Sequence, residues 1–174
     1  MKKRDLFVPE GIYTNIYEIT AELLTSLGKK GAIFDIDNTV APYETAQPTE
    51  KMKEYFASLA DMGITMAFVS NNKGSRASIF NKELGFFCIA GASKPSTKGI
   101  KKCLTHMKLS KEEVVVVGDQ IFTDCLAAHR TDVDFFMVKP INDKETVFFK
   151  LKRLLEKPSI SLFYKKRRTQ NFEK

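Results

Sequence analysis

Four aspartates follow two apolar runs of the chain, Asp35 and Asp37 after one run and Asp119 and Asp124 after the other. Carboxylates gathered in one place repel one another unless a cation lies among them. Oxygen ligands without histidine or cysteine select a hard ion, and Mg²⁺ is the expected cofactor because it combines a few carboxylates with water and phosphate. A carboxylate beside Mg²⁺ can attack phosphorus, and Asp35 is the best-placed nucleophile. Asp37 is placed to protonate the leaving oxygen and then to activate water.

Three further polar residues, Ser70, Asn71 and Lys94, come shortly after two other apolar runs. Ser70 and the amides around Asn71 offer hydrogen bonds to phosphoryl oxygens. Lys94 offers a compact positive charge, which would offset the charge on the nucleophile and on the transition state. Together with the aspartates, these residues predict a site that binds and transfers a phosphoryl group.

The elements that must position these residues are short apolar segments alternating with helical patterns. The segments are rich in β-branched and aromatic side chains, as is typical of buried parallel strands. They cover residues 32–34, 64–69, 86–89, 114–117 and 135–138, and helices are expected at 48–61, 75–84, 96–107, 121–129 and 144–156. This alternation predicts an α/β fold, a Rossmann-like three-layer sandwich with a central parallel sheet. Ligands of such sheets bind at the carboxyl ends of the strands, where the polar residues stand.

The length of 174 residues fits one domain, which we expect over residues 1–157, followed by a basic tail at 158–174. The cysteines Cys88, Cys103 and Cys125 form no CxxC pair, so they indicate reduced thiols of a cytoplasmic protein rather than a disulfide framework or a zinc site. No apolar run approaches the roughly 20 residues of a transmembrane helix, and the basic start lacks the apolar stretch of a signal peptide.

The net charge of +7 comes entirely from the end of the chain, because residues 150–174 hold nine basic and two acidic side chains. An apolar face at 147–155 predicts that the last helix packs on the sheet. Beyond it, residues 160–168 join apolar and aromatic side chains to four consecutive cations. This pattern suits peripheral contact with an anionic membrane at its inner face, binding of RNA phosphates, or a merely solvated tail. The sequence leaves these alternatives and the oligomeric state open.

Four segments in order along the chain resemble the motifs of the haloacid dehalogenase superfamily of phosphatases. They are FDIDNTV at 34–40, VSNN at 69–72, SKP at 93–95 and VGD at 117–119 with Asp124 beyond it. The resemblance implies a nucleophilic Asp35, an acid and base in Asp37, and phosphate binding by Ser70 and Lys94. The metal ligands that it implies are Asp35, the carbonyl oxygen of Asp37, and Asp119. Asp124 would support the metal shell or Lys94.

Four further residues are assigned roles outside the catalytic chemistry. We expect Thr39 to organise the loop after Asp37 by hydrogen bonding to backbone. Arg76 is expected on a helix surface, and so are His106 and His129, because neither histidine stands at the end of a strand.

A narrower resemblance, over nearly the whole chain, is to the YqeG-type, subclass IIIA phosphatases. Their eukaryotic relatives are phosphatidylglycerophosphate phosphatases, so the resemblance implies dephosphorylation of phosphatidylglycerophosphate to phosphatidylglycerol through an aspartyl-phosphate. The segments between Asp37 and Ser70 and between Ser70 and Lys94 each have room for one helix and one strand, without a cap domain. An open site suits a large substrate such as a lipid headgroup. Two alternatives remain: a phosphatase of a phosphoprotein, nucleic-acid end or metabolite, and an RNA- or ribosome-associated protein with a vestigial site.

Overall fold

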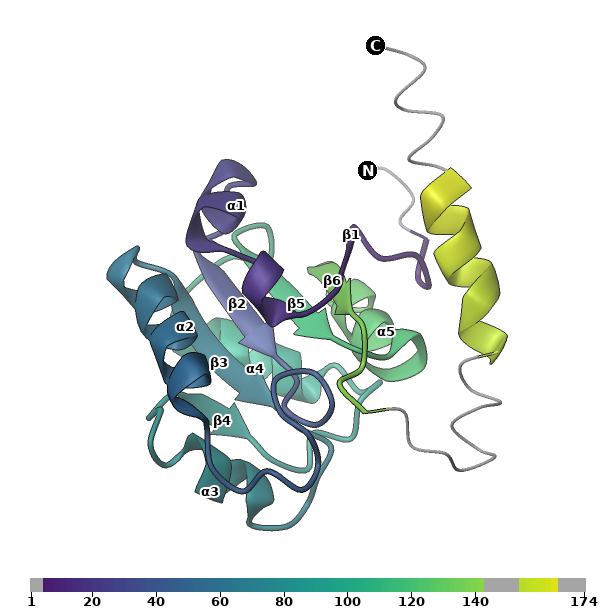
Figure 1. Cartoon of the computed structure of the whole chain (residues 1–174). Helices are drawn as coiled ribbons and strands as arrows, with labels where there is room; N and C mark the ends of the chain where they lie inside the picture. The colour runs from purple at the N-terminus through teal and green to yellow at the C-terminus, as the bar shows by residue number, and fades with distance from the viewer. Residues whose placement is uncertain (1–4, 143–153, 166–174) are drawn as a thin grey trace.

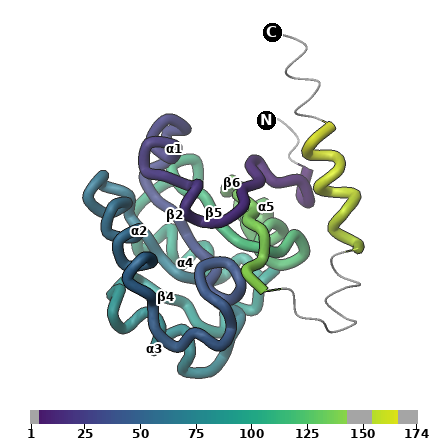
Figure 2. Tube along the Cα trace, viewed as in Figure 1, coloured from purple at the N-terminus to yellow at the C-terminus, as the bar shows by residue number. Residues whose placement is uncertain are grey.

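The computed structural model describes residues 5–142 and 154–165. A six-stranded sheet in the order β1-β6-β5-β2-β3-β4 forms its centre, with helices packed against it (Figure 1; Figure 2). The strands are β1 (Gly11–Tyr13), β2 (Gly31–Phe34), β3 (Thr65–Val69), β4 (Phe87–Ile89), β5 (Val114–Gly118) and β6 (Asp134–Val138). The helices are α1 (Ala21–Ser26), α2 (Glu50–Asp61), α3 (Arg76–Asn81), α4 (Lys98–Met107) and α5 (Leu126–His129), with a 3₁₀ turn η1 (Ile16–Glu18) and a π-helical turn η2 (Ile121–Cys125). Residues 154–165 are also helical.

The central strands β2 and β5 are parallel and buried along their whole length. Their side chains alternate between two apolar clusters on opposite faces of the sheet. Val115 and Val117 join the cluster that contains Phe56 of α2, whereas Val114 and Val116 join the cluster beneath α4 and α5. Burial on both faces explains the continuous apolar runs and confirms the predicted three-layer α/β fold.

All five predicted strands are present, and their pairings are parallel. The structure adds β1, which pairs with β6 at the edge of the sheet, Gly11 opposite Phe136. A strand of three residues is too short to show a periodic pattern in the sequence. Strand β1 is also held by pairing with β6, which lies more than 100 residues later in the chain.

Four of the predicted helices lie close to their expected positions, with differences at their ends. Helix α2 begins after Thr49, whose side chain accepts a hydrogen bond from the Met52 N–H and so caps the first turn. The expected helix at 121–129 divides into η2 and α5. The short helix α1 was not predicted. Between β2 and β3 the chain forms α2, and between β3 and β4 it forms α3, so the described stretch 35–113 contains no cap domain.

The predicted last helix falls largely on residues 143–153, which lie outside the described residues. The described helical residues 154–165 continue past the expected end at residue 156, with Phe163 and Glu156 buried. Within residues 5–142 and 154–165, no helix combines the length and the apolar character needed to cross a bilayer.

The N-terminal segment covers His129, which is buried and not on a helix surface as expected. Its Nε2 lies 3.0 Å from a carboxylate oxygen of Glu10, and its Nδ1 lies 3.1 Å from the carbonyl oxygen of Leu6. Glu10 also accepts a hydrogen bond from the Phe135 N–H at 2.8 Å. His129 therefore joins the segment before β1 to the helix before β6. The other histidine, His106, is exposed as expected and stacks on Phe87.

Candidate active site

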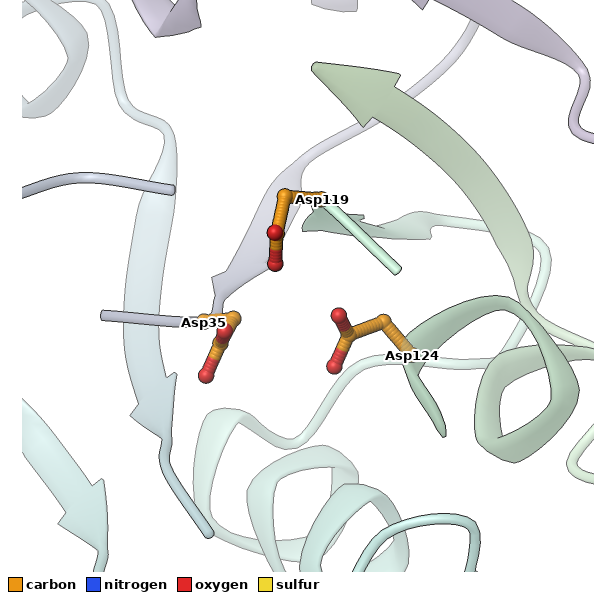
Figure 3. Close-up of side chains that lie close together, drawn as sticks. All are labelled: Asp35, Asp119 and Asp124. Atoms are coloured by element: carbon orange, nitrogen blue, oxygen red, sulfur yellow. The ribbon is translucent and has the colours of Figure 1, made fainter. Parts of the chain in front are cut away.

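Three carboxylates meet at the carboxyl end of the central strands. Asp35 follows β2, Asp119 follows β5, and Asp124 belongs to η2. Each offers an oxygen within 4.8 Å of the others, and Figure 3 shows the three side chains close together. All three are buried, with at most 6% of their surface exposed. The structure thus brings together aspartates from separate parts of the sequence.

Lys94 supplies a positive charge inside this cluster. Its Nζ lies 2.6 Å from Asp35 Oδ1 and 2.6 Å from Asp124 Oδ1, and it donates to the Val69 carbonyl oxygen at 3.0 Å. Burial alone would lower the pKa of Lys94, but Asp124 and Asp35 raise it above its ordinary value. The two aspartates therefore favour the charged form of the Lys94 ammonium group inside the carboxylate cluster.

The nucleophile candidate Asp35 lies in an environment that disfavours its charge. Burial raises the pKa of Asp35 well above its ordinary value, and the neighbouring Asp124 and Asp119 raise it further, against the opposing effect of Lys94. Three buried carboxylates with one ammonium group leave an excess of negative charge. The all-oxygen donor set of Asp35, Asp119 and Asp124 therefore fits a hard divalent cation.

Lys94 is positioned by Asn71. The Asn71 side chain donates to the Lys94 carbonyl oxygen at 3.1 Å and accepts from the Lys94 N–H at 2.6 Å. The sequence predicted that Asn71 contacts phosphate. The Asn71 side chain is engaged with the backbone of Lys94. The backbone N–H of Asn71 is therefore the group to which the prediction of phosphate binding applies.

Asp37 is held apart from the three buried carboxylates. The Ser70 hydroxyl donates to its Oδ2 at 3.1 Å, and Arg76 Nε donates to its Oδ1 at 2.7 Å. Ser70 is fully buried and also accepts a hydrogen bond from the Asn72 N–H. Both oxygens of the predicted acid and base thus have fixed partners.

Arg76 belongs to the site, which corrects the expectation of a surface position. Its side chain is 15% exposed, and its terminal nitrogens donate to the carbonyl oxygens of Pro42 and Thr45. One sequence signal was available: Arg76 is the first residue of α3, and the positive end of a helix dipole disfavours a cation unless a nearby acid compensates.

The loop after Asp37 is a tight turn. The Val40 N–H donates to the Ile36 carbonyl oxygen, and Asn38 has a positive φ of 63°. This turn directs the Thr39 hydroxyl toward Asp119 Oδ1, which it contacts at 3.5 Å. The Thr39 hydroxyl thus contacts the carboxylate cluster, and not the backbone of the loop as expected from sequence.

Gly118, the last residue of β5, leaves room for Asp124. A Cβ atom at Gly118 would lie 2.6 Å from both Cβ and Cγ of Asp124, closer than real Cβ atoms approach. The approach of η2 to the end of β5 therefore requires glycine at this position.

Comparisons with known proteins agree with this geometry. The sequence model of the haloacid dehalogenase-like hydrolases matches residues 15–138. The Bacillus subtilis protein described as "Probable phosphatase YqeG" is 32% identical over 163 residues, which cover 94% of this chain and 95% of that protein. Phosphatidylglycerophosphate phosphatase 1 of Arabidopsis thaliana is 27% identical over 85% of this chain but only 45% of its own length.

Solved structures share the fold. The cobalt-bound deoxy-D-mannose-octulosonate 8-phosphate phosphatase of Haemophilus influenzae superposes with a TM-score of 0.54 over 72% of this chain and 75% of its own, at 16% identity. An uncharacterised protein of Listeria monocytogenes gives a TM-score of 0.51 over 67% of this chain and 84% of its own, at 17% identity.

Proposed function

The chain belongs to the haloacid dehalogenase-like hydrolase family and is a phosphatase of that family, and we propose that it acts with Mg²⁺ through an aspartyl-phosphate on Asp35. The observation that carries this proposal is the buried cluster of Asp35, Asp119 and Asp124 around the Lys94 ammonium group. Its chemistry suits an anionic phosphoryl group that must be held beside an anionic nucleophile.

Asp35 performs the first step of the proposed reaction. Its carboxylate attacks the phosphorus of the ester, and the bond between phosphorus and the leaving oxygen breaks as the bond to Asp35 forms. Asp37 gives its proton to the leaving oxygen. Lys94, whose Nζ lies 2.6 Å from Asp35, is placed to neutralise charge on the transferring group.

Hydrolysis of the intermediate regenerates the enzyme. Asp37, now a carboxylate, takes a proton from water as the water oxygen attacks phosphorus. The bond between phosphorus and Asp35 breaks, inorganic phosphate leaves, and Asp37 is again protonated. Ser70 and Arg76 hold the Asp37 carboxylate, the form that takes this proton, in place.

The cation is assigned to the buried carboxylates. Asp35 and Asp119 would hold Mg²⁺ with the carbonyl oxygen of Asp37, as expected from sequence, and the position of Asp124 adds it to this set. Bound Mg²⁺ supplies Lewis-acid stabilisation of phosphoryl oxygens.

The proposed substrate is phosphatidylglycerophosphate, which would be converted to phosphatidylglycerol. The similarity to the Arabidopsis enzyme of that name supports it. The absence of a cap in the described stretch 35–113 also supports it, because an uncapped site leaves room for a headgroup still attached to its bilayer.

Phosphate release from phosphatidylglycerophosphate in mixed micelles with Mg²⁺ tests both the proposed reaction and the proposed substrate. We expect release by the wild type and its loss in Asp35→Asn and in EDTA. Turnover of an aryl phosphate that depends on Asp35, without turnover of the lipid, would keep the chemistry and remove the substrate. Failure with both substrates would overturn the proposed reaction and leave RNA binding by a vestigial site as the reading to test next.

A further inference from the structure

The helical residues 154–165 pack against the rest of the protein through one face. Phe163 and Glu156 are buried, and Ile160 packs against the apolar cluster that contains residues of α5. Figure 1 shows this helix at the side of the molecule that carries β1 and α5. One face of the helix is therefore satisfied by the body of the protein.

The opposite face is apolar as well. Leu154, Leu155, Pro158 and Leu162 are exposed, and their spacing of i, i+1, i+4 and i+8 places them along one side of the helix. Leu154 and Leu155 are 56% and 57% exposed, and Leu162 is 37% exposed. We call these four residues the outer stripe. A surface helix normally presents polar side chains on its outward face, so the outer stripe indicates a partner.

Basic side chains accompany the outer stripe. Lys157 and Lys165 are exposed on the same helix, and the sequence continues with Lys166, Arg167 and Arg168. The last 25 residues carry the whole net charge of +7. Apolar side chains bordered by cations suit the interface of an anionic bilayer, where apolar groups enter the lipid and cations meet the headgroups. RNA would use the cations but leave the leucines exposed.

A hydrogen bond connects this helix to the catalytic loop. The Glu156 carboxylate accepts from the Ile121 N–H at 2.9 Å, and Ile121 lies two residues beyond Asp119. We call residues 119–124, which carry Asp119 and Asp124, the catalytic loop. The helix contacts this loop through its buried face, on the side opposite the outer stripe.

We propose that the outer stripe of residues 154–162 docks the protein on an anionic lipid bilayer. Binding to the bilayer is independent of the proposed phosphatase reaction. Only the idea that this binding brings the enzyme to a lipid substrate rests on the proposed function. The bilayer is the occupant that the paired apolar and basic character of this helix fits.

Flotation with lipid vesicles tests the docking surface. The full chain is mixed with vesicles of phosphatidylglycerol and phosphatidylcholine, or of phosphatidylcholine alone. We expect the wild type to float with the anionic vesicles, and Leu155→Gln with Leu162→Gln to reduce the bound fraction by about tenfold, because two apolar side chains no longer leave water. The matched control is Leu27→Gln with Met62→Gln, because these residues are similarly exposed at 50% and 54% on other helix ends.

Aryl phosphate turnover, measured on the same preparations, separates docking from chemistry. Both double variants should keep wild-type turnover and wild-type melting temperatures. A wild type that does not bind anionic vesicles would overturn the docking proposal, as would equal binding by the Leu155 and Leu162 double variant. Loss of RNA binding in that variant, with vesicle binding intact, would overturn it in favour of RNA. Absent turnover in a wild type that still floats would refute the proposed function alone.

Discussion

The Nε of the Arg76 guanidinium donates to Asp37 Oδ1, at a distance of 2.7 Å. The terminal nitrogens of the same group donate to the carbonyl oxygens of Pro42 and Thr45. One side chain thus joins the predicted acid and base to the loop that precedes α2. Since Ser70 donates to the other carboxylate oxygen, the orientation of Asp37 is determined from both sides. Arg76 therefore positions Asp37 for the proton transfer that we propose.

Replacement of Arg76 should make the reaction sensitive to the leaving group. Arg76→Lys keeps the positive charge but loses the planar set of donors, so Asp37 is no longer held in a fixed orientation toward the leaving oxygen. We expect kcat to fall by about tenfold or more with alkyl phosphates, which need protonation of the leaving oxygen, and much less with nitrophenyl phosphate. Steady-state rates over a series of leaving groups measure this effect.

Asp37→Asn provides the reference for the Arg76 series, because it removes the proton donor directly. The two variants should show the same steepened dependence on leaving group. An equal loss on every substrate in Arg76→Lys, accompanied by a lower melting temperature, would assign Arg76 to folding alone.

Replacement of Lys94 should make stability depend on the cation. Lys94→Met leaves Asp35 and Asp124 buried without their ammonium partner, at a cost of about 3 kcal/mol in the free energy of unfolding. A divalent cation restores the charge balance, so Mg²⁺ should raise the melting temperature of the variant more than that of the wild type. Thermal unfolding in EDTA and in Mg²⁺ measures both effects.

The matched control for Lys94 is Lys111→Met, because Lys111 forms an exposed ion pair with Asp132. That variant should change the free energy of unfolding by less than about 1 kcal/mol. A similarly small change in Lys94→Met would contradict the charge balance described here. Catalysis by Lys94→Met should be lost whether or not the fold recovers.

The central fold was predictable because burial on both faces of a parallel sheet leaves continuous apolar runs in the sequence. The positions of Asp35, Asp119 and Lys94 followed from the same reasoning, since the carboxyl ends of the strands meet at one edge. Both inferences need only the position of a residue along the strand, and not the conformation of its side chain.

Contacts made by side chains across long stretches of sequence were not predictable. His129 is buried because the segment with Leu6 and Glu10 crosses over it, and no local pattern records that approach. Arg76 meets Asp37 across 39 residues of sequence and also donates to the carbonyl oxygens of Pro42 and Thr45 in the loop after Asp37.

Alanine at Gly118 should disable the site. The added methyl group would lie 2.6 Å from Asp124, so Asp124 must move away from Lys94 and the other carboxylates. Displacement by about 1 Å is enough to lower kcat by about a hundredfold. Gly74→Ala is the control, because its methyl group would meet only the Asn72 side-chain oxygen, at 3.3 Å. Calorimetric titration with Mg²⁺ should show weaker binding in Gly118→Ala, and unchanged binding would contradict this account.

Removal of the Glu156 carboxylate should loosen the catalytic loop. Glu156 is buried and accepts the Ile121 N–H at 2.9 Å, so Glu156→Ala leaves a backbone donor without this acceptor. We expect a loss of about 1–3 kcal/mol in the free energy of unfolding, measured in urea, and a lower kcat under conditions where the variant is folded. Glu156→Gln keeps an acceptor oxygen of the same reach and should recover most of both quantities. Equal losses in the two variants would show that the charge of Glu156, and not its hydrogen bond, holds the loop between Asp119 and Asp124.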